Sequence, residues 1–218
     1  MIDDYAYATG RARALEAKIR AVETIAPSQI LKEYGLDEKA LDASIDRLME
    51  KNFSEFTESA PEAVLPFRIL ADLQNMKSFI RISKKRGEAM FSKLGTFVMG
   101  EKQDETSTKL KDAGYGEVAE KLKGLTEMNP RDSDLWLEQY FTGRIQNKFF
   151  KEFLSFRRNY LETEEAPEDF YKRMSDFIKE NSMLKNMHID VITAFLLLKQ
   201  RELELARARV IGAREVIS

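Results

Sequence analysis

The chain has 218 residues, of which 33% are charged, but acidic and basic residues nearly balance and the formal net charge is -2. A near-neutral chain with interspersed charges is not typical of bulk nucleic-acid binders, and the lack of cysteine excludes disulfides and thiolate chemistry and fits a reducing compartment. The N-terminus has no apolar signal segment, and the longest apolar run, Ala194 to Leu198, is too short to span a bilayer, so we expect a cytoplasmic protein.

The first half of the chain predicts amphipathic helices separated by glycine and proline. Apolar residues recur at steps of three and four from Tyr5 to Val22, which lines one face of a helix that ends before Pro27. Ser28 can cap the next, short helix, and Pro61 fits the first turn of a later one, where its missing N–H is tolerated. We therefore expect helices over residues 5–22, 29–34, 37–49 and 61–86.

Residues 88–108 interrupt this pattern. Gly95 and Gly100 bracket four residues that could form a short strand, and a polar stretch from Glu101 to Thr108 follows. Four residues without a second alternating run cannot build a sheet. We place the domain boundary here, with a first helical repeat at residues 1–95, a connection at 96–108 and a second helical repeat at 109–218.

The second half predicts four further helices, over residues 110–123, 133–160, 167–179 and 189–216. The second of these carries a dense stripe of large apolar side chains, which at helical spacing indicates core packing and not a cofactor pocket. The stripe consists of Leu135, Trp136, Tyr140, Phe141, Phe149, Phe150, Phe153 and Phe156. The whole sequence predicts an all-α protein of repeated helical units.

Catalytic equipment is scarce in the sequence. His188 is the only histidine, which excludes a Ser-His-Asp triad, a multi-histidine metal site and a Glu-x-x-His pair. No phosphate-binding loop occurs, since Gly114 and Gly116 lack a preceding strand and a third glycine. We expect no catalytic residue, cofactor or metal. A helical enzyme would need carboxylates to gather round a metal, and the candidates are Glu138, Glu152 and Glu162.

The last predicted helix combines apolar residues with many charges. One interpretation is a solvated face with intrahelical ion pairs, and the other is an arginine-bearing surface for a partner, because Arg is enriched at interfaces. Both interpretations stay open. The segment from Val191 to Arg214 also parallels the one from Val64 to Arg86, since each begins apolar and ends as a charged helix. This parallel indicates either an internal repeat of about 100 residues or a coincidence between two amphipathic helices.

Three stretches resemble the central-stalk subunit of V/A-type rotary ATPases, called C in archaeal and bacterial complexes and d in eukaryotic ones. The opening of the chain, at residues 4–16, reads DYAYATGRARALE and is similar to the family's paired tyrosines followed by spaced arginines and Leu-Glu. Residues 71–81 read ADLQNMKSFIR and resemble its Asp-x-x-Asn-Leu-Lys segment with a trailing arginine. Residues 199–212 read KQRELELARARVIG and are similar to its closing helix, although Leu205 and Ala206 stand where asparagines are expected.

The resemblance implies a non-catalytic, compact or funnel-like helical socket that couples the central shaft of the ATP-driven motor to the membrane proteolipid ring for ion or proton transport. Such a subunit is attached to the membrane only peripherally, through its partners. The family usually has three repeated units and this chain has room for about two, so we expect a shortened member. The alternative is a stand-alone helical adaptor or regulatory module that diverged from the family. The implied interface residues are Arg11, Arg13, Asn75, Lys77, Arg81, Glu202, Arg207 and Arg209.

Overall fold

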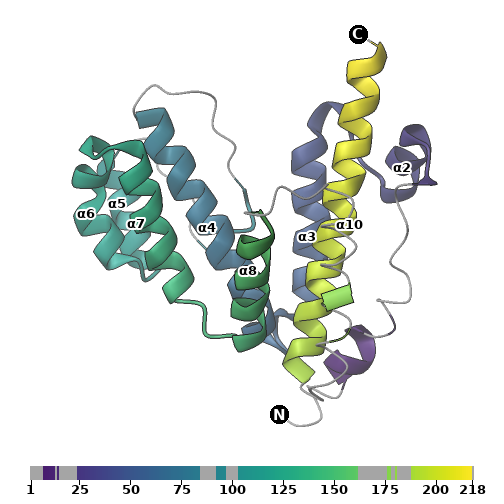
Figure 1. Cartoon of the computed structure of the whole chain (residues 1–218), viewed down its shortest axis with the longest axis horizontal. Helices are drawn as coiled ribbons and strands as arrows, with labels where there is room; N and C mark the ends of the chain where they lie inside the picture. Colours follow the sequence, from purple (N-terminus) through teal and green to yellow (C-terminus); the bar gives the residue numbers. More distant parts are fainter. Residues whose placement is uncertain are drawn as a thin grey trace. The chain divides into compact units, whose positions relative to one another are not determined.

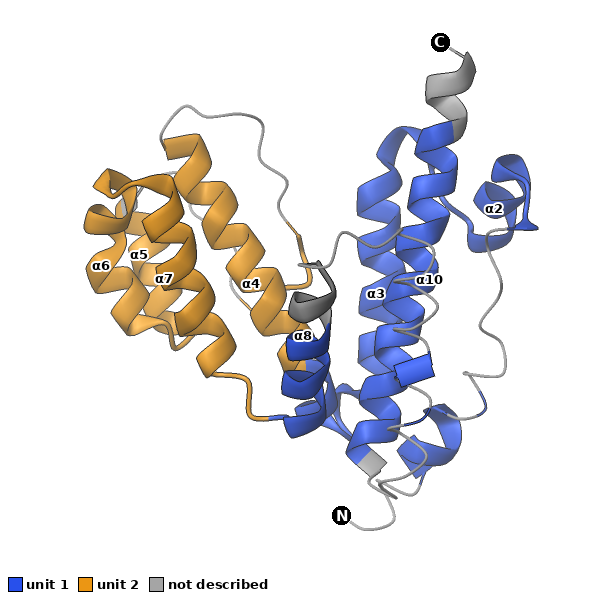
Figure 2. Ribbon diagram, viewed as in Figure 1, with its two compact units in different colours: residues 1–64, 147–218 blue, residues 65–146 orange. Residues whose placement is uncertain are grey.

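The computed structural model describes residues 7–12, 14, 24–83, 92–96, 103–161, 176–177, 180 and 188–217. Within these ranges every regular element is a helix, which confirms the all-α class (Figure 1). The chain forms two compact units (Figure 2). Unit 1 combines Met1–Val64 with Asn147–Ser218, and unit 2 is the continuous stretch Leu65–Gln146. The boundaries expected from composition, at residues 95 and 109, both lie inside unit 2.

Unit 1 begins with helical residues 7–12 and 14, the described part of the helix expected at 5–22. The next helix, α2 (Pro27–Tyr34), starts with Pro27 in its first turn, so Ser28 lies within the helix and is not its cap. Gly35 ends α2 in the left-handed conformation (φ 61°), which glycine adopts without steric strain. Pro27 and Gly35 therefore define the two ends of this helix.

The core of unit 1 is built around α3 (Leu41–Thr57) and α10 (His188–Ile217), which lie side by side (Figure 1). Residues 191–198 of α10 are all buried, so this part of the helix is enclosed on every side. Further along, α10 packs against α2 and α3, and α3 follows directly on the short 3-10 helix η2 (Glu38–Ala40). The buried cluster that joins α2, α3 and α10 consists of Ile30, Leu36, Leu41, Ala206 and Val210.

Unit 2 contains most of α4 (Pro61–Ser83), followed by α5 (Gln103–Asp112), α6 (Gly116–Glu127) and α7 (Pro130–Gly143). The polar residues 101–108 predicted a connection, yet α5 begins within them. Two features stabilise this helix. Thr106 and Leu110 are fully buried, and the exposed face carries an ion pair between Lys109 and Glu105 at 2.7 Å. The expected four-residue strand lies largely outside the described residues, and Thr96 itself is in a bend.

The single helix expected at 133–160 is two helices, α7 and α8 (Lys148–Leu161). Helix α7 ends at Gly143, a poor helix former, and the Asn147 side chain accepts a hydrogen bond from the Phe150 N–H at 2.8 Å at the start of α8. The apolar stripe is accordingly divided between the units, α7 in unit 2 and α8 in unit 1. Its buried members among the described side chains are Phe141, Phe149, Phe150 and Phe153, whereas Leu135 is 52% exposed.

Candidate partner interface

Glu202 is buried in unit 1, although the resemblance implies an interface role for it. Its side chain is 1% exposed and accepts hydrogen bonds from the Tyr34 hydroxyl and from Lys199 Nζ, the latter at 2.6 Å. A buried carboxylate needs such donors, because an unpaired buried charge is costly. Glu202 therefore ties α2 to α10, and its charge is directed to groups inside the fold.

Arg207 and Arg209 lie nearer the C-terminal end of α10. Arg207 donates to both carboxylate oxygens of Asp42 on α3, from Nε at 2.5 Å and from Nη2 at 3.4 Å. This hydrogen bonding to Asp42 raises the pKa of Arg207 above its ordinary value, against the opposing effect of partial burial. Arg209 is exposed and donates to the Ile25 carbonyl at 3.4 Å. Both side chains remain accessible to solvent: Arg209 is exposed and the Arg207 side chain is 38% exposed.

Arg11 lies on the N-terminal helical segment and pairs with Glu55 on α3, with Nε 3.0 Å from Oε2. Asp42 lies in the first turn of α3 and Glu55 near its end, so the two ion pairs are separated by roughly 20 Å along the helix. The structure thus does not gather Arg11 and Arg207 into one patch. Arg13 lies outside the described residues.

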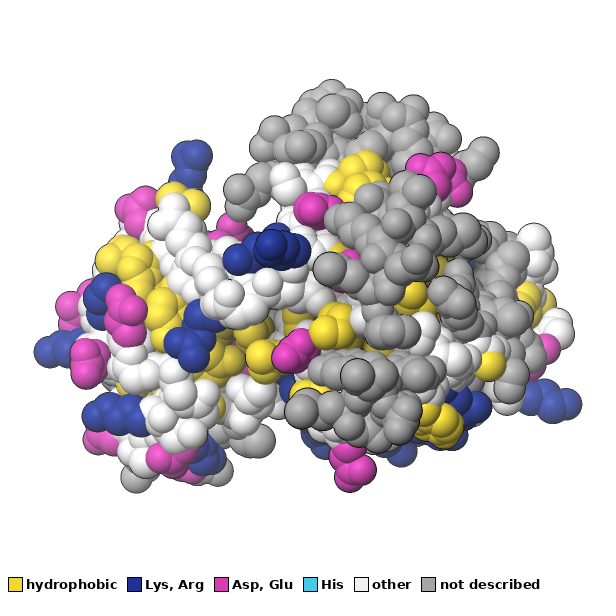
Figure 3. Space-filling model, turned by 90° about the horizontal axis from the view of Figure 1, so that it is seen from below, with side chains coloured by type: hydrophobic (Ala, Val, Ile, Leu, Met, Phe, Trp, Pro, Cys, Tyr) yellow, Lys and Arg dark blue, Asp and Glu magenta, His cyan; other side chains and the backbone are white. Residues whose placement is uncertain are grey.

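In unit 2, Lys77 and Arg81 lie one turn apart on α4 and face α7. Lys77 pairs with Glu138, and Arg81 Nη2 lies 3.4 Å from Asp134 Oδ2. Both ion pairs join the same two helices, and partly exposed pairs of this kind stabilise such packing only modestly. Basic and acidic side chains are likewise interspersed on the surface drawn in Figure 3. Lys77 and Arg81 therefore form ion pairs within unit 2.

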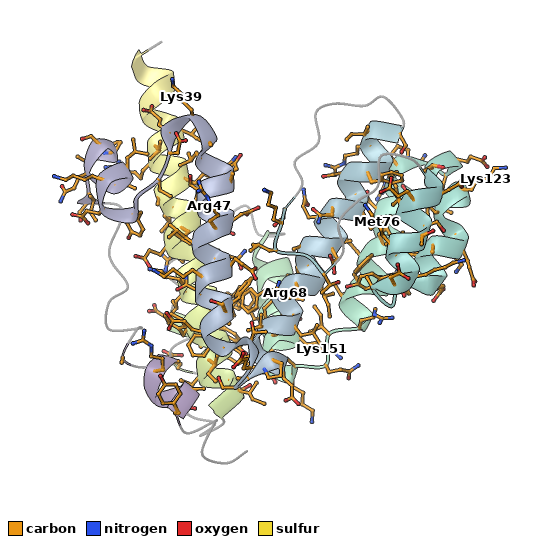
Figure 4. The ribbon with its side chains drawn as sticks, turned by 180° about the vertical axis from the view of Figure 1, so that it is seen from behind. Lys39, Arg47, Arg68, Met76, Lys123 and Lys151 are labelled. Atoms are coloured by element: carbon orange, nitrogen blue, oxygen red, sulfur yellow. The ribbon has the colours of Figure 1, made fainter. Side chains whose placement is uncertain are left out.

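Asn75 is 3% exposed and binds the backbone of the segment 92–96. Its Nδ2 donates to the Ser92 carbonyl at 2.9 Å, and the Ser92 N–H donates back to Oδ1 at 2.8 Å. One turn earlier, the fully buried Asp72 accepts from the Thr96 N–H at 2.8 Å and from the Thr96 hydroxyl at 2.5 Å. Arg68, seen on α4 in Figure 4, donates to the Leu94 carbonyl at 3.1 Å.

Tyr115 completes this polar cluster from the turn before α6. Its hydroxyl donates to Asp72 Oδ2 at 2.5 Å in a buried setting. Burial, together with the hydrogen bond to Asp72, raises the pKa of Tyr115 well above its ordinary value. Asp72 is the aspartate of the motif at residues 71–81, but neither it nor Tyr115 is among the interface residues that the resemblance implies. Gly95 is part of the same arrangement, because a Cβ there would collide with the Asp72 carboxylate.

The second and third stretches of the resemblance share one arrangement of side chains, in α4 of unit 2 and in α10 of unit 1. Each helix buries an acid, Asp72 or Glu202, that accepts a hydrogen bond from a tyrosine hydroxyl elsewhere in its unit. Five residues after each acid, a cation pairs with a carboxylate on a neighbouring helix. The tyrosines are Tyr115 and Tyr34, and the cations are Lys77 and Arg207.

The carboxylates considered for a helical enzyme do not form a metal site in the described part of the chain. Glu138 is paired with Lys77 in unit 2, Glu152 belongs to unit 1 and Glu162 lies outside the described residues. Among the side chains that the structure describes, no three Asp, Glu, His or Cys residues are grouped closely enough to hold a metal ion. No described helix has the length and apolar character needed to cross a membrane.

Comparison of the chain with protein-family models, with curated proteins and with solved structures gave no significant match.

Proposed function

We propose that the chain is a non-catalytic central-stalk subunit of a V/A-type rotary ATPase, of the kind called C or d, with fewer repeats than is usual. In this role it forms a helical socket that grips the foot of the central shaft and seats on the membrane proteolipid ring. It transmits torque between ATP turnover and ion or proton transport. Its place is on the cytoplasmic side of the membrane, where protein partners hold it.

The observation that carries this proposal is the side-chain arrangement shared by α4 and α10. In two of the three stretches that resemble the family, a buried acid accepts a hydrogen bond from a tyrosine hydroxyl, and a cation five residues later pairs with a carboxylate on a neighbouring helix. This shared combination supports the interpretation of a repeated helical unit over that of a coincidence.

A subunit that transmits torque has to be rigid, and unit 1 has the packing that this requires. The described parts of the two ends of the chain both attach to α3, the N-terminal segment through Arg11 and α10 through Arg207. In addition, α10 is enclosed along residues 191–198, and Phe195 meets Phe56 edge to face with ring centroids 5.7 Å apart. Close-packed interiors of this kind transmit strain well.

Affinity purification tests the proposal. The full-length chain, tagged and expressed in its source cells, should recover shaft and ring subunits from gently solubilised membranes. Recovery of neither would refute the proposal. Recovery of a defined set of unrelated proteins would favour the stand-alone adaptor in its place.

The accessible cations of α10 are the groups most suited to a partner. Arg209→Glu should lower the recovery of partners at least ~tenfold while leaving thermal unfolding unchanged, because its single 3.4 Å hydrogen bond contributes little to the fold. Lys51→Glu is the matched control, since Lys51 is also exposed on a helix of unit 1. Equal losses in the two variants would argue against a specific role for Arg209.

A further inference from the structure

We propose that residues 92–96 are a latch on unit 2 that opens and closes by local unfolding, without unfolding of the helices, and that opening uncovers Asp72 and Asn75 on α4. The segment has no regular secondary structure and forms a turn and a bend over α4. It is a separate structural device from the ion pairs that join α4 to α7.

The latch is held by polar contacts with α4. Four of its backbone groups bind side chains of this helix: the N–H and the carbonyl of Ser92, the carbonyl of Leu94 and the N–H of Thr96. The Thr96 hydroxyl adds a further hydrogen bond to Asp72. Water can replace each of these partners when the segment lifts away, so the net free energy of each bond is small.

Burial is unequal on the two sides of this contact. None of the five latch residues is buried, whereas Asp72 is 0% exposed and Asn75 is 3% exposed. Opening therefore exposes polar groups, which gain hydration, and little apolar surface. In the helices the balance is reversed, because residues such as Met76 and Leu122 are fully enclosed. Segments with few buried apolar contacts open at lower free energy than the core does.

Asp72 keeps a donor when the latch is open. The Tyr115 hydroxyl donates to the same carboxylate from the turn before α6. It also lies 3.3 Å from the Thr96 hydroxyl, and only this second contact is lost when the latch opens. The link between α4 and α6 therefore persists in the open state, and the buried acid is not left without a hydrogen bond. This is the reason to expect a local opening and not the unfolding of unit 2.

The closed state leaves no room for a side chain at Gly95. A Cβ at this position would collide with the Asp72 carboxylate and lie 3.1 Å from Asn75 Nδ2. A Cβ at Gly124, on α6 of the same unit, would have no heavy atom within 4 Å. Gly95→Ala and Gly124→Ala thus make the same chemical change, and only the first pushes the latch away from α4.

Amide hydrogen exchange in the full-length wild-type chain tests the inference, with Ser92 and Thr96 reporting on the latch and Met76 and Leu122 on the core. The latch amides should exchange at least ~100-fold faster than the core amides, at rates nearly independent of urea below the unfolding transition. If the latch and core amides share the same rate and the same urea dependence, the latch does not open separately.

The glycine variants give a second measure. Gly95→Ala should speed exchange of the Ser92 and Thr96 amides at least ~tenfold and leave the Met76 and Leu122 amides within ~twofold of wild type. Gly124→Ala places a better helix former in α6 and should speed none of the four. A Gly95→Ala chain that fails to fold, or one in which the core amides accelerate as much as those of the latch, would overturn the inference.

Discussion

At the scale of single residues, the structure pairs Asp72 of α4 and Glu202 of α10 with tyrosine hydroxyls. The Tyr115 hydroxyl donates a hydrogen bond to Asp72, and the Tyr34 hydroxyl donates one to Glu202. These partners are 43 and 168 residues away along the chain. A local sequence pattern does not show such pairs. For this reason Glu202 and Asn75 could be singled out from sequence, but their burial could not.

The Tyr115 contact should make stability depend on alkaline pH. Burial and the Asp72 hydrogen bond raise the pKa of Tyr115 in the folded state above the ordinary value of 10.0, so the unfolded chain loses this proton first as pH rises. The stabilisation is therefore complete below pH ~10 and is lost as pH increases toward the folded-state pKa. Urea unfolding should find wild type ~1–3 kcal/mol more stable than Tyr115→Phe at pH 7, with the difference shrinking above pH ~10. A difference that stays constant to pH 11 would contradict this.

The Arg207–Asp42 pair should contribute little to the free energy of unfolding. Both side chains are partly exposed, at 38% and 51%, and solvent screens pairs of this kind to ~0.2–1 kcal/mol. Arg207→Glu should therefore lower stability by only ~1 kcal/mol, and the swapped pair Asp42→Arg with Arg207→Glu should recover most of that loss. A double-mutant cycle by urea unfolding measures the coupling. A loss above ~3 kcal/mol in the single variant would mean that Arg207 is mainly structural.

At the scale of elements, the helix ends marked by proline or glycine were predicted best. Gly35 and Pro61 mark helix ends as predicted, because they act through the local backbone, whereas α2 begins at Pro27 and not after a cap at Ser28. The helix expected at 110–123 is divided between α5 and α6, because Gly114 adopts a positive φ of 81° between them. Residues 103–109 of α5 were not predicted as helix, since this helix is stabilised by burial of Thr106 and Leu110 and not by a long apolar period. The division into α7 and α8 was not predicted either. The continuous aromatic stripe indicated one long helix, although Gly143 and Asn147 are residue types that often end and begin helices.

The enclosed part of α10 should be the most sensitive element of unit 1. Phe195 is 2% exposed and packs on Phe56, so Phe195→Ala should lower the free energy of unfolding by ~3–5 kcal/mol through the cavity it leaves. Leu135→Ala is a control on an exposed apolar side chain and should change it by no more than ~0.5 kcal/mol. Chemical denaturation compares the two. Similar losses at both sites would contradict the packing described for α10.

At the scale of the whole molecule, the all-α class followed from the sequence, because helical periodicity recurs along nearly the whole chain. The spatial division did not follow, since unit 1 is assembled from both ends of the chain and unit 2 lies between them. Which helices pair over such separations depends on long-range packing that no local window reports. The shared arrangement in α4 and α10 became visible only when the side chains that contact each acid were known.

Structure determination of the complex that is purified from source membranes through a tag on this chain tests the central claim most directly. The proposal predicts one defined position for the chain, between the foot of the central shaft and the proteolipid ring, with Arg207 and Arg209 of α10 facing a partner subunit. A complete ATPase that lacks this chain, or a tagged chain that recovers no ATPase subunits, would contradict it.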